Sequence, residues 1–74
     1  MAKKNQHIVP LGNGWAVKSA GADKATIITT KQSDAISVGR TIARNNHTEL
    51  IVHGRDGKIR GRNTYGNNSN LLQG

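Results

Sequence analysis

The residues best suited to chemistry gather in one stretch, GRDGKIRGR at 54–62, in which four of nine residues are Lys or Arg and three are Gly. Guanidinium and ammonium groups bind phosphate oxygens well. The stretch does not match the phosphate-binding loop G-x-x-x-x-G-K-[ST], because its glycines flank a turn between β-rich runs and do not open a helix. The sequence therefore predicts a hairpin with a cationic face that contacts phosphates. The predicted contacts are Lys18, Arg55, Lys58, Arg60 and Arg62, with Lys3, Lys4, Arg40 and Arg44 as further candidates.

The predicted register of this hairpin follows from a two-residue turn at Asp56 and Gly57, since Asp-Gly between two β-rich runs is a strong hairpin signal. Arg55 then pairs with Lys58, and the next outward pairs are His53 with Arg60 and Ile51 with Arg62. Leu50, Val52 and Ile59 point the other way, toward the expected core. Like charges opposite each other destabilise a hairpin, so either a bound anion relieves the repulsion or the side chains splay into water at a cost of a few tenths of a kcal/mol. A bulge or a three-residue turn would change this register.

Catalytic and metal-binding groups are sparse. The chain has no Cys and only four acidic residues. Glu49 and His53 lie on one predicted strand about 13 Å apart, too far to act together. The three imidazoles, His7, His47 and His53, lack the spacing of a zinc site, and a meeting of His7 with His53 would supply two ligands only. We expect no catalysis, no metal and no cofactor.

The formal net charge of +7 attracts polyanions, with nucleic acid first and an anionic membrane second. The alternative is that the charge serves solubility. Aromatic residues that could stack on bases are few, because Trp15 is expected in the core and Tyr65 is the one remaining candidate. The sequence thus favours a non-enzymatic module that binds the phosphate backbone of DNA or RNA, sensitively to salt and with weak specificity.

A protein-interaction module is the rival interpretation. Short sheets with open edges pair strand to strand, either in a homodimer or with a partner chain. An outward Ile51, with Ile27 or Ile28, would supply an apolar spot for such an interface. The chain has no apolar run of the ~18–20 residues that span a membrane and no signal-peptide pattern, so we expect a cytoplasmic protein without a membrane partner.

The pattern of apolar residues predicts an α+β fold of two layers, one helix packed on a mainly antiparallel sheet, in the order β-β-β-α-β-β. The predicted domain covers 7–62, between a basic tail at 1–6 and an Asn- and Gly-rich tail at 63–74. The predicted strands are 7–11, 15–19, 24–30, 49–53 and 58–62, and the predicted helix is 31–46.

Several residues carry local expectations. Pro10 should place its strand at an edge of the sheet or end it early, because proline cannot donate to a ladder. Asn13 and Gly14 suit a type I′ turn. Thr30 or Ser33 is expected to cap the helix. Gly39 lies within the apolar sector of the helix, so we expect a close approach of the helix backbone to the sheet there.

Taken together, eight short stretches resemble one family of small bacterial proteins. They are NQH at 5–7, VP at 9–10, GWAVK at 14–18, AI at 35–36, IARN at 42–45, ELIVH at 49–53, DGKI at 56–59 and YGN at 65–67. In these stretches the chain resembles the DUF-2188 family, a domain of unknown function, over nearly its whole length. Gly39, where an Ala is more usual, and the ending NSNLLQG depart from the family pattern. The resemblance implies a compact β-rich domain with a helix, found in bacteria and their phages, and no assigned activity.

Overall fold

The computed structural model of the chain describes residues 4–65. They contain one helix and five strands in the predicted order β-β-β-α-β-β. These are β1 (Gln6–Leu11), β2 (Gly14–Ser19), β3 (Ile27–Thr29), α1 (Gln32–Asn46), β4 (Glu49–His53) and β5 (Ile59–Thr64). Lys3 and most of the two predicted tails, 1–3 and 66–74, lie outside the described residues.

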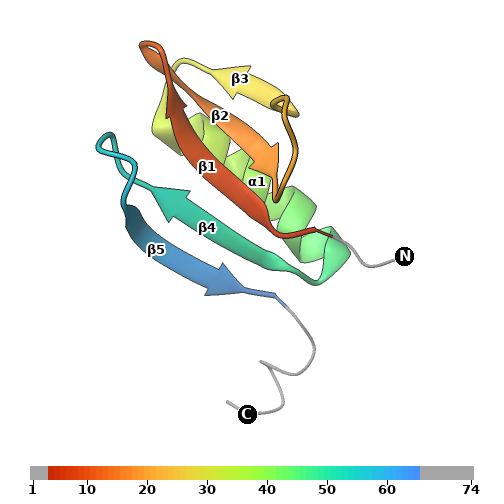
Figure 1. Cartoon of the computed structure of the whole chain (residues 1–74). Helices are drawn as coiled ribbons and strands as arrows, with labels where there is room; N and C mark the ends of the chain where they lie inside the picture. Colours follow the sequence, from red (N-terminus) through yellow and green to blue (C-terminus); the bar gives the residue numbers. More distant parts are fainter. Residues whose placement is uncertain (1–3, 66–74) are drawn as a thin grey trace.

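The five strands form one sheet in the order β3-β2-β1-β4-β5, and α1 lies across one face of it (Figure 1). Three of the four pairings are antiparallel, and the fourth, between β1 and β4, is parallel. The sheet therefore consists of an antiparallel unit, β3-β2-β1, and a hairpin, β4-β5, joined along one parallel seam. The predicted α+β fold with a mainly antiparallel sheet is confirmed.

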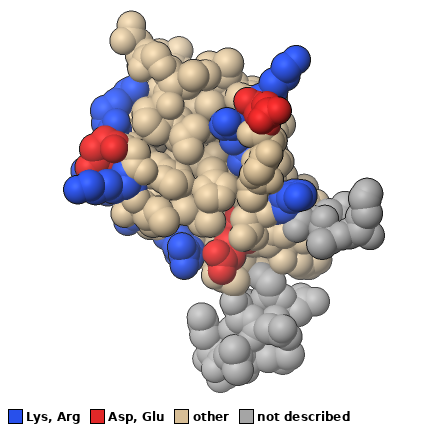
Figure 2. Space-filling model, viewed as in Figure 1, with Lys and Arg blue, Asp and Glu red and all other residues tan. Residues whose placement is uncertain are grey.

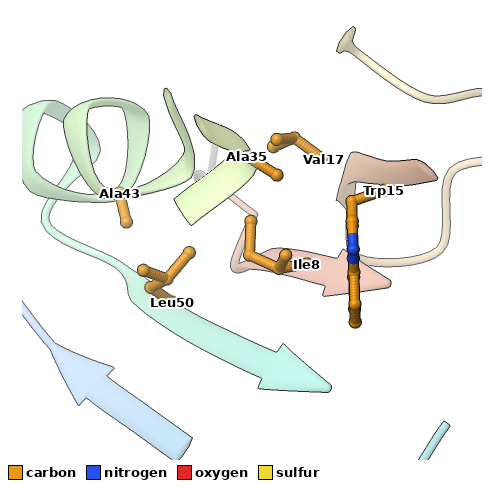
Figure 3. Packing of buried hydrophobic residues seen from close by; sticks show 6 residues of the cluster. All are labelled: Ile8, Trp15, Val17, Ala35, Ala43 and Leu50. Carbon is orange, nitrogen blue, oxygen red and sulfur yellow. The ribbon is translucent and has the colours of Figure 1, made fainter. Parts of the chain in front are cut away.

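The hydrophobic core fills the space between α1 and the sheet (Figure 3). Every buried residue that the helix supplies is small, namely Ala35, Gly39 and Ala43 at intervals of four residues. Residues spaced by four share one face of a helix, so these three form a flat stripe. The sheet supplies the large side chains, of which Ile8, Leu50 and Val17 are fully buried. Trp15 is also buried, as expected, at 7% exposure.

Gly39 lies where the helix comes closest to the sheet. A β-carbon at this position would lie 2.7 Å from Cδ1 of Ile8 and 2.8 Å from Cδ1 of Leu50. Both distances are shorter than real side chains tolerate without movement. The predicted close approach at Gly39 is confirmed, and it explains why a poor helix former occupies the middle of the helix.

The expectation for Pro10 is wrong, because β1 is the central strand of the sheet. The parallel pairing with β4 runs only from Gln6 to Ile8 on β1, so the ladder on that side ends before Pro10. Pro10 still pairs with Trp15 on the β2 side. The central strand accommodates proline because β4 does not extend beside it.

The β1–β2 turn also differs from its prediction. The two turn residues are Gly12 and Asn13, and Leu11 pairs with Gly14. Only Gly12 has a positive φ, 57°, whereas a type I′ turn needs one at both central residues. Glycine at the first central position is typical of a type II′ turn.

Neither Thr30 nor Ser33 caps the helix. Lys31 occupies the N-cap position in an extended conformation and forms no capping bond through its side chain. The start of α1 is instead tied to the sheet, because the Gln32 side-chain amide donates to the carbonyl oxygen of His53 at 3.1 Å. β3 is shorter than predicted, and β5 runs two residues further, to Thr64.

Candidate nucleic-acid interface

The sheet face opposite α1 carries a row of residues from four strands. The pairings His7 with Lys18, His7 with Ile51, and Ile51 with Arg62 align these residues across β2, β1, β4 and β5. Side chains alternate between faces along a strand, so Val9 and His53 lie on the same side as this row. We call this surface the open face, defined by His7, Val9, Lys18, Glu49, Ile51, His53 and Arg62.

Figure 2 is viewed from the side of the open face. Lys and Arg atoms lie at separate points in this view, most of them near the outline and one group nearer the middle, with acidic groups beside some of them and uncharged surface between them. Ile51, which the sequence placed outward, does face this side but is only 6% exposed. Lys and Arg side chains therefore lie at separate points of the open face and do not cover it.

The predicted hairpin register is correct on one side of a bulge and wrong on the other. Ile51 pairs with Arg62 as expected, but His53 pairs with Ile59 and not with Arg60. The turn contains three residues, because the Gly54 amide donates to the Lys58 carbonyl at 2.7 Å. This longer turn shifts the register by one residue, and the bulge between Val52 and His53 shifts it back.

The shift moves three predicted side chains off their expected faces. Ile59, expected in the core, pairs with His53 and is 53% exposed. Arg60 and Arg55, expected on the cationic face, line a cavity that also contacts Trp15, Val52 and Gln32, on the side of the helix. The five predicted phosphate contacts therefore do not share one face. Lys18 and Arg62 lie on the open face, Lys58 is exposed beside the turn, and Arg55 and Arg60 lie toward α1.

Arg55 fastens the β4–β5 turn to the β1–β2 turn. Its guanidinium lies over the Trp15 ring, 4.5 Å from the ring centre. It also donates to the carbonyl oxygens of Gly12 at 3.1 Å, Gly14 at 3.2 Å and Asn13 at 3.3 Å. A flat guanidinium satisfies several acceptors and a π-face at once, which an ammonium group cannot do. This contact was not predicted, because it joins residues about forty positions apart.

The other hairpin arginines each have a carboxylate neighbour. Arg62 Nε lies 3.7 Å from Glu49 Oε1, and Arg60 Nη2 lies 4.0 Å from Asp56 Oδ2. Both pairs are exposed to solvent, so each contributes little to stability. Asp56 also accepts a hydrogen bond from the Lys58 amide at 3.0 Å, which stabilises the turn.

Two imidazoles meet on the open face across the parallel seam. His7 Nδ1 lies 3.0 Å from His53 Nε2, and the two ring planes are inclined by 27° with their centres 5.2 Å apart. His53 Nδ1 lies 3.0 Å from the carbonyl oxygen of Gly57. The sequence showed that His7 and His53 would meet if their strands paired on the same face, and β1 and β4 do pair.

The His7 imidazole is harder to protonate than a free imidazole. Burial lowers its pKa below the ordinary value of 6.5, and the neighbouring His53 and then Arg62 lower it further. At neutral pH His7 is therefore uncharged. Among residues 4–65, no group of three or more His, Cys, Asp or Glu side chains is placed to hold a metal ion.

A cavity of about 290 Å³ opens beside the imidazole pair. Its walls come from β1, β2, β4 and the chain that follows β2. The lining residues are His7, Val9, Lys18, Ser19, Ala20, Gly21, Ala22 and His53. It is the place on the open face where a cation, an imidazole and a concave surface coincide.

Comparison with known proteins places the chain in a family. The profile of the family described as "Uncharacterized protein conserved in bacteria (DUF2188)" matches residues 6–65, which covers all five strands and the helix. The chain belongs to this family, and the resemblance found in the sequence is confirmed. The match includes both histidines of the pair and the whole cationic hairpin.

One curated relative is "Uncharacterized protein YdaT" of Bacillus subtilis (strain 168), which is 36% identical over 59 residues. The alignment covers 80% of this chain and 39% of the relative, so the chain spans well under half of that protein's length. No solved structure matches the chain. Within residues 4–65, α1 is too short and too polar to cross a membrane.

Proposed function

We propose that this chain is a non-enzymatic module that binds the phosphate backbone of DNA or RNA through the open face of its sheet. The observation that carries the proposal is the row of Lys18, His7 and Arg62 across four strands, on the face that α1 leaves uncovered. Lys18 and Arg62 are three strand spacings apart, about 14 Å. At this separation, Lys18 and Arg62 contact separate phosphates along one nucleic-acid strand, and Lys58 at the turn contacts a further phosphate.

Within this proposal, Arg55 and Arg60 have a different task from the one the sequence suggested. Arg55 is bonded to the β1–β2 turn, and Arg60 lies on the side of the sheet that faces α1. They position the hairpin, while Lys18, Lys58 and Arg62 contact phosphate. A small number of phosphate contacts and few stacking aromatics predict modest affinity with little sequence preference. A nucleic-acid partner also implies a cytoplasmic location in the bacterial cell.

Fluorescence anisotropy of labelled duplex DNA and RNA at about 50 and 200 mM salt tests the proposal, because phosphate contacts make affinity fall with salt. Lys18→Ala with Arg62→Ala should weaken binding and reduce the slope of log affinity against log salt by about 1.8, about 0.9 for each lost contact. The matched control is Arg40→Ala with Arg44→Ala, which removes the same charge from the exposed side of α1. An equal loss in the control would refute the open face as the site, and no binding at low salt would refute the function.

A second candidate is pairing through the edge of β3, either between two copies or with a partner strand. The supporting observation is that Ile27 and Ile28 on this edge strand are 42% and 62% exposed. Sedimentation measured across a range of protein concentrations distinguishes a homodimer from a monomer. Ile28→Lys should abolish such a dimer. A monomer at every concentration would eliminate the homodimer.

A further inference from the structure

The hydrogen bonds of the His7–His53 pair have only one possible direction. The Gly57 carbonyl can only accept, so His53 donates from Nδ1 and its Nε2 becomes the acceptor. His7 must then donate from Nδ1 to His53 Nε2. In the neutral pair, His7 Nε2 is the one ring nitrogen that is left with an unused lone pair.

Adding a proton at His7 Nε2 leaves this chain of hydrogen bonds unchanged. The His7 ring becomes an imidazolium that still donates from Nδ1 to His53, now as a charge-assisted bond. A second proton would place two positive rings in contact, so the pair takes up one proton only. Protonation therefore converts His7 Nε2 from a neutral hydrogen-bond acceptor into a cationic donor while both rings keep their positions.

Lys18 lies beside His7 across the β1–β2 ladder and lines the same cavity. A cavity of about 290 Å³ has ample room for a group the size of a phosphate. An anion there would meet the Lys18 ammonium group and His7 Nε2 together. The lone pair of neutral His7 repels such an anion, and the proton reverses this interaction.

We infer that the cavity lined by His7, Lys18 and Ala20–Ala22 is a subsite for one phosphate group, and that the His7–His53 pair takes up one proton when the phosphate binds. This inference rests on the proposed function for the source of the phosphate, which is the backbone of a nucleic acid. Binding through this subsite strengthens as the pH falls.

The other charged groups on this face set the direction of the effect. Lys18 of β2 and Arg62 of β5 are cationic, Glu49 of β4 pairs with Arg62, and the His53 ring accepts a hydrogen bond from His7. In the absence of a ligand, burial, then the neighbouring His53 and then Arg62 hold the pKa of His7 below its ordinary value. A bound anion offsets the cations, so it raises the pKa of His7 and draws in the proton.

The decisive experiment follows the His7 and His53 ring signals by NMR from about pH 5 to 8, with sodium sulfate or with sodium chloride at equal ionic strength. Sulfate is the probe because it stays a dianion throughout this range, so any proton taken up belongs to the protein. We expect sulfate to raise the apparent pKa of the pair by about one unit, which equals about tenfold tighter sulfate binding to the protonated form. A titration curve that sulfate does not move overturns the inference.

Three variants locate the effect. His7→Gln should abolish the sulfate-linked titration, and Lys18→Gln should keep the titration but shrink the shift caused by sulfate. His47→Asn is the matched control, since it removes an imidazole outside the open face, and Asn tolerates the left-handed conformation of this residue, φ 57°. If His7→Gln fails to fold, Lys18→Gln carries the test alone. An unchanged shift in Lys18→Gln refutes the subsite.

Oligonucleotide binding separates this inference from the proposed function. An anisotropy titration with about 12 nucleotides of single-stranded DNA should give at least a few-fold higher affinity at about pH 5.5 than at pH 8, and His7→Gln should remove the difference. Binding that is independent of pH refutes the proton-linked subsite and leaves backbone binding intact. A sulfate shift without any oligonucleotide binding refutes the proposed function and leaves the anion subsite intact.

Discussion

Replacing Gly39 with Ala sets two effects of known size against each other. In a helix interior, Ala is favoured over Gly by about 1 kcal/mol. The new β-carbon would lie 2.7 Å from Cδ1 of Ile8 and 2.8 Å from Cδ1 of Leu50, and both side chains are fully buried. Overpacking of this kind costs about 1–3 kcal/mol. We expect Gly39→Ala to lower the free energy of unfolding by up to about 2 kcal/mol, despite the better helix former.

A double-mutant cycle with Ile8→Val isolates the steric part. Valine lacks the Cδ1 atom nearest to the new β-carbon, and Ile8→Val alone should cost about 0.5–1.5 kcal/mol. In that background, Gly39→Ala should become more favourable by about 1 kcal/mol or more, which would appear as a coupling energy between the two sites. The remaining contact with Leu50 limits the rescue.

Urea unfolding followed by the fluorescence of Trp15 provides the assay, because Trp15 is buried and is the single Trp of the chain. Ser37→Ala and Ser37→Gly, at an exposed position of α1, give the difference between Ala and Gly without any contact to the sheet. If Gly39→Ala stabilises the protein by as much as Ala is favoured over Gly at position 37, the close approach is not restrictive and the reasoning is wrong.

Three further predictions concern stability. Arg55→Ala should lower the free energy of unfolding by about 1–2 kcal/mol, and Arg55→Lys should recover little of it, because the ammonium group cannot reproduce the guanidinium contacts; full recovery in urea unfolding would contradict this. Gly61→Val should raise the free energy of unfolding by about 0.5–1 kcal/mol, because an added β-carbon meets no atom within 4 Å. Gly57→Val should lower the free energy of unfolding, because φ is 86° at this position. Thermal unfolding that ranks the two variants in the opposite order would refute both predictions. The free energy of unfolding should fall as the pH drops below 6.5 toward the lowered pKa of His7, because in this range the unfolded chain binds more protons than the folded chain. His7→Gln should flatten this part of the pH profile of stability. An unchanged profile in this variant would exclude His7 as the source of the pH dependence.

The sequence was sufficient for those elements whose patterns are local. Alternation predicted the strand Glu49–His53 to the residue, and the helical period predicted α1 to within one residue at its start. Gly39 in an apolar sector correctly indicated close packing. These features depend on neighbours within a few positions, and the period of the side chains records them directly.

The parts that failed depend on partners distant in the sequence. Pro10 indicated an edge strand, yet β1 is central, because the extent of β4 decides which amides of β1 need a partner. The hairpin register changed because a three-residue turn and a bulge compensate each other, and Asp-Gly alone does not distinguish this arrangement from a two-residue turn. Arg55 was assigned to phosphate because nothing near it in the sequence reveals Trp15 as its neighbour.

The candidate site was predicted in the same uneven way. Lys18 and Arg62 were placed correctly, since the alternation of β2 and β5 decides their face. The His7–His53 pair was recognisable as a conditional contact, and the missing information was that β1 and β4 pair in parallel.

The parallel seam gives this small sheet an internal joint. The β1–β2 ladder has six residue pairs closed by a two-residue turn, whereas the β1–β4 seam has three pairs that join residues more than forty positions apart. Local hairpins form before contacts that close a long loop, so the seam should form after the two hairpins during folding. The His7–His53 bond crosses this joint. A ligand that strengthens the bond would therefore slow hydrogen exchange of the β4 amides. A ligand bound to the open face would thus stabilise the contact between the β3-β2-β1 unit and the β4-β5 hairpin.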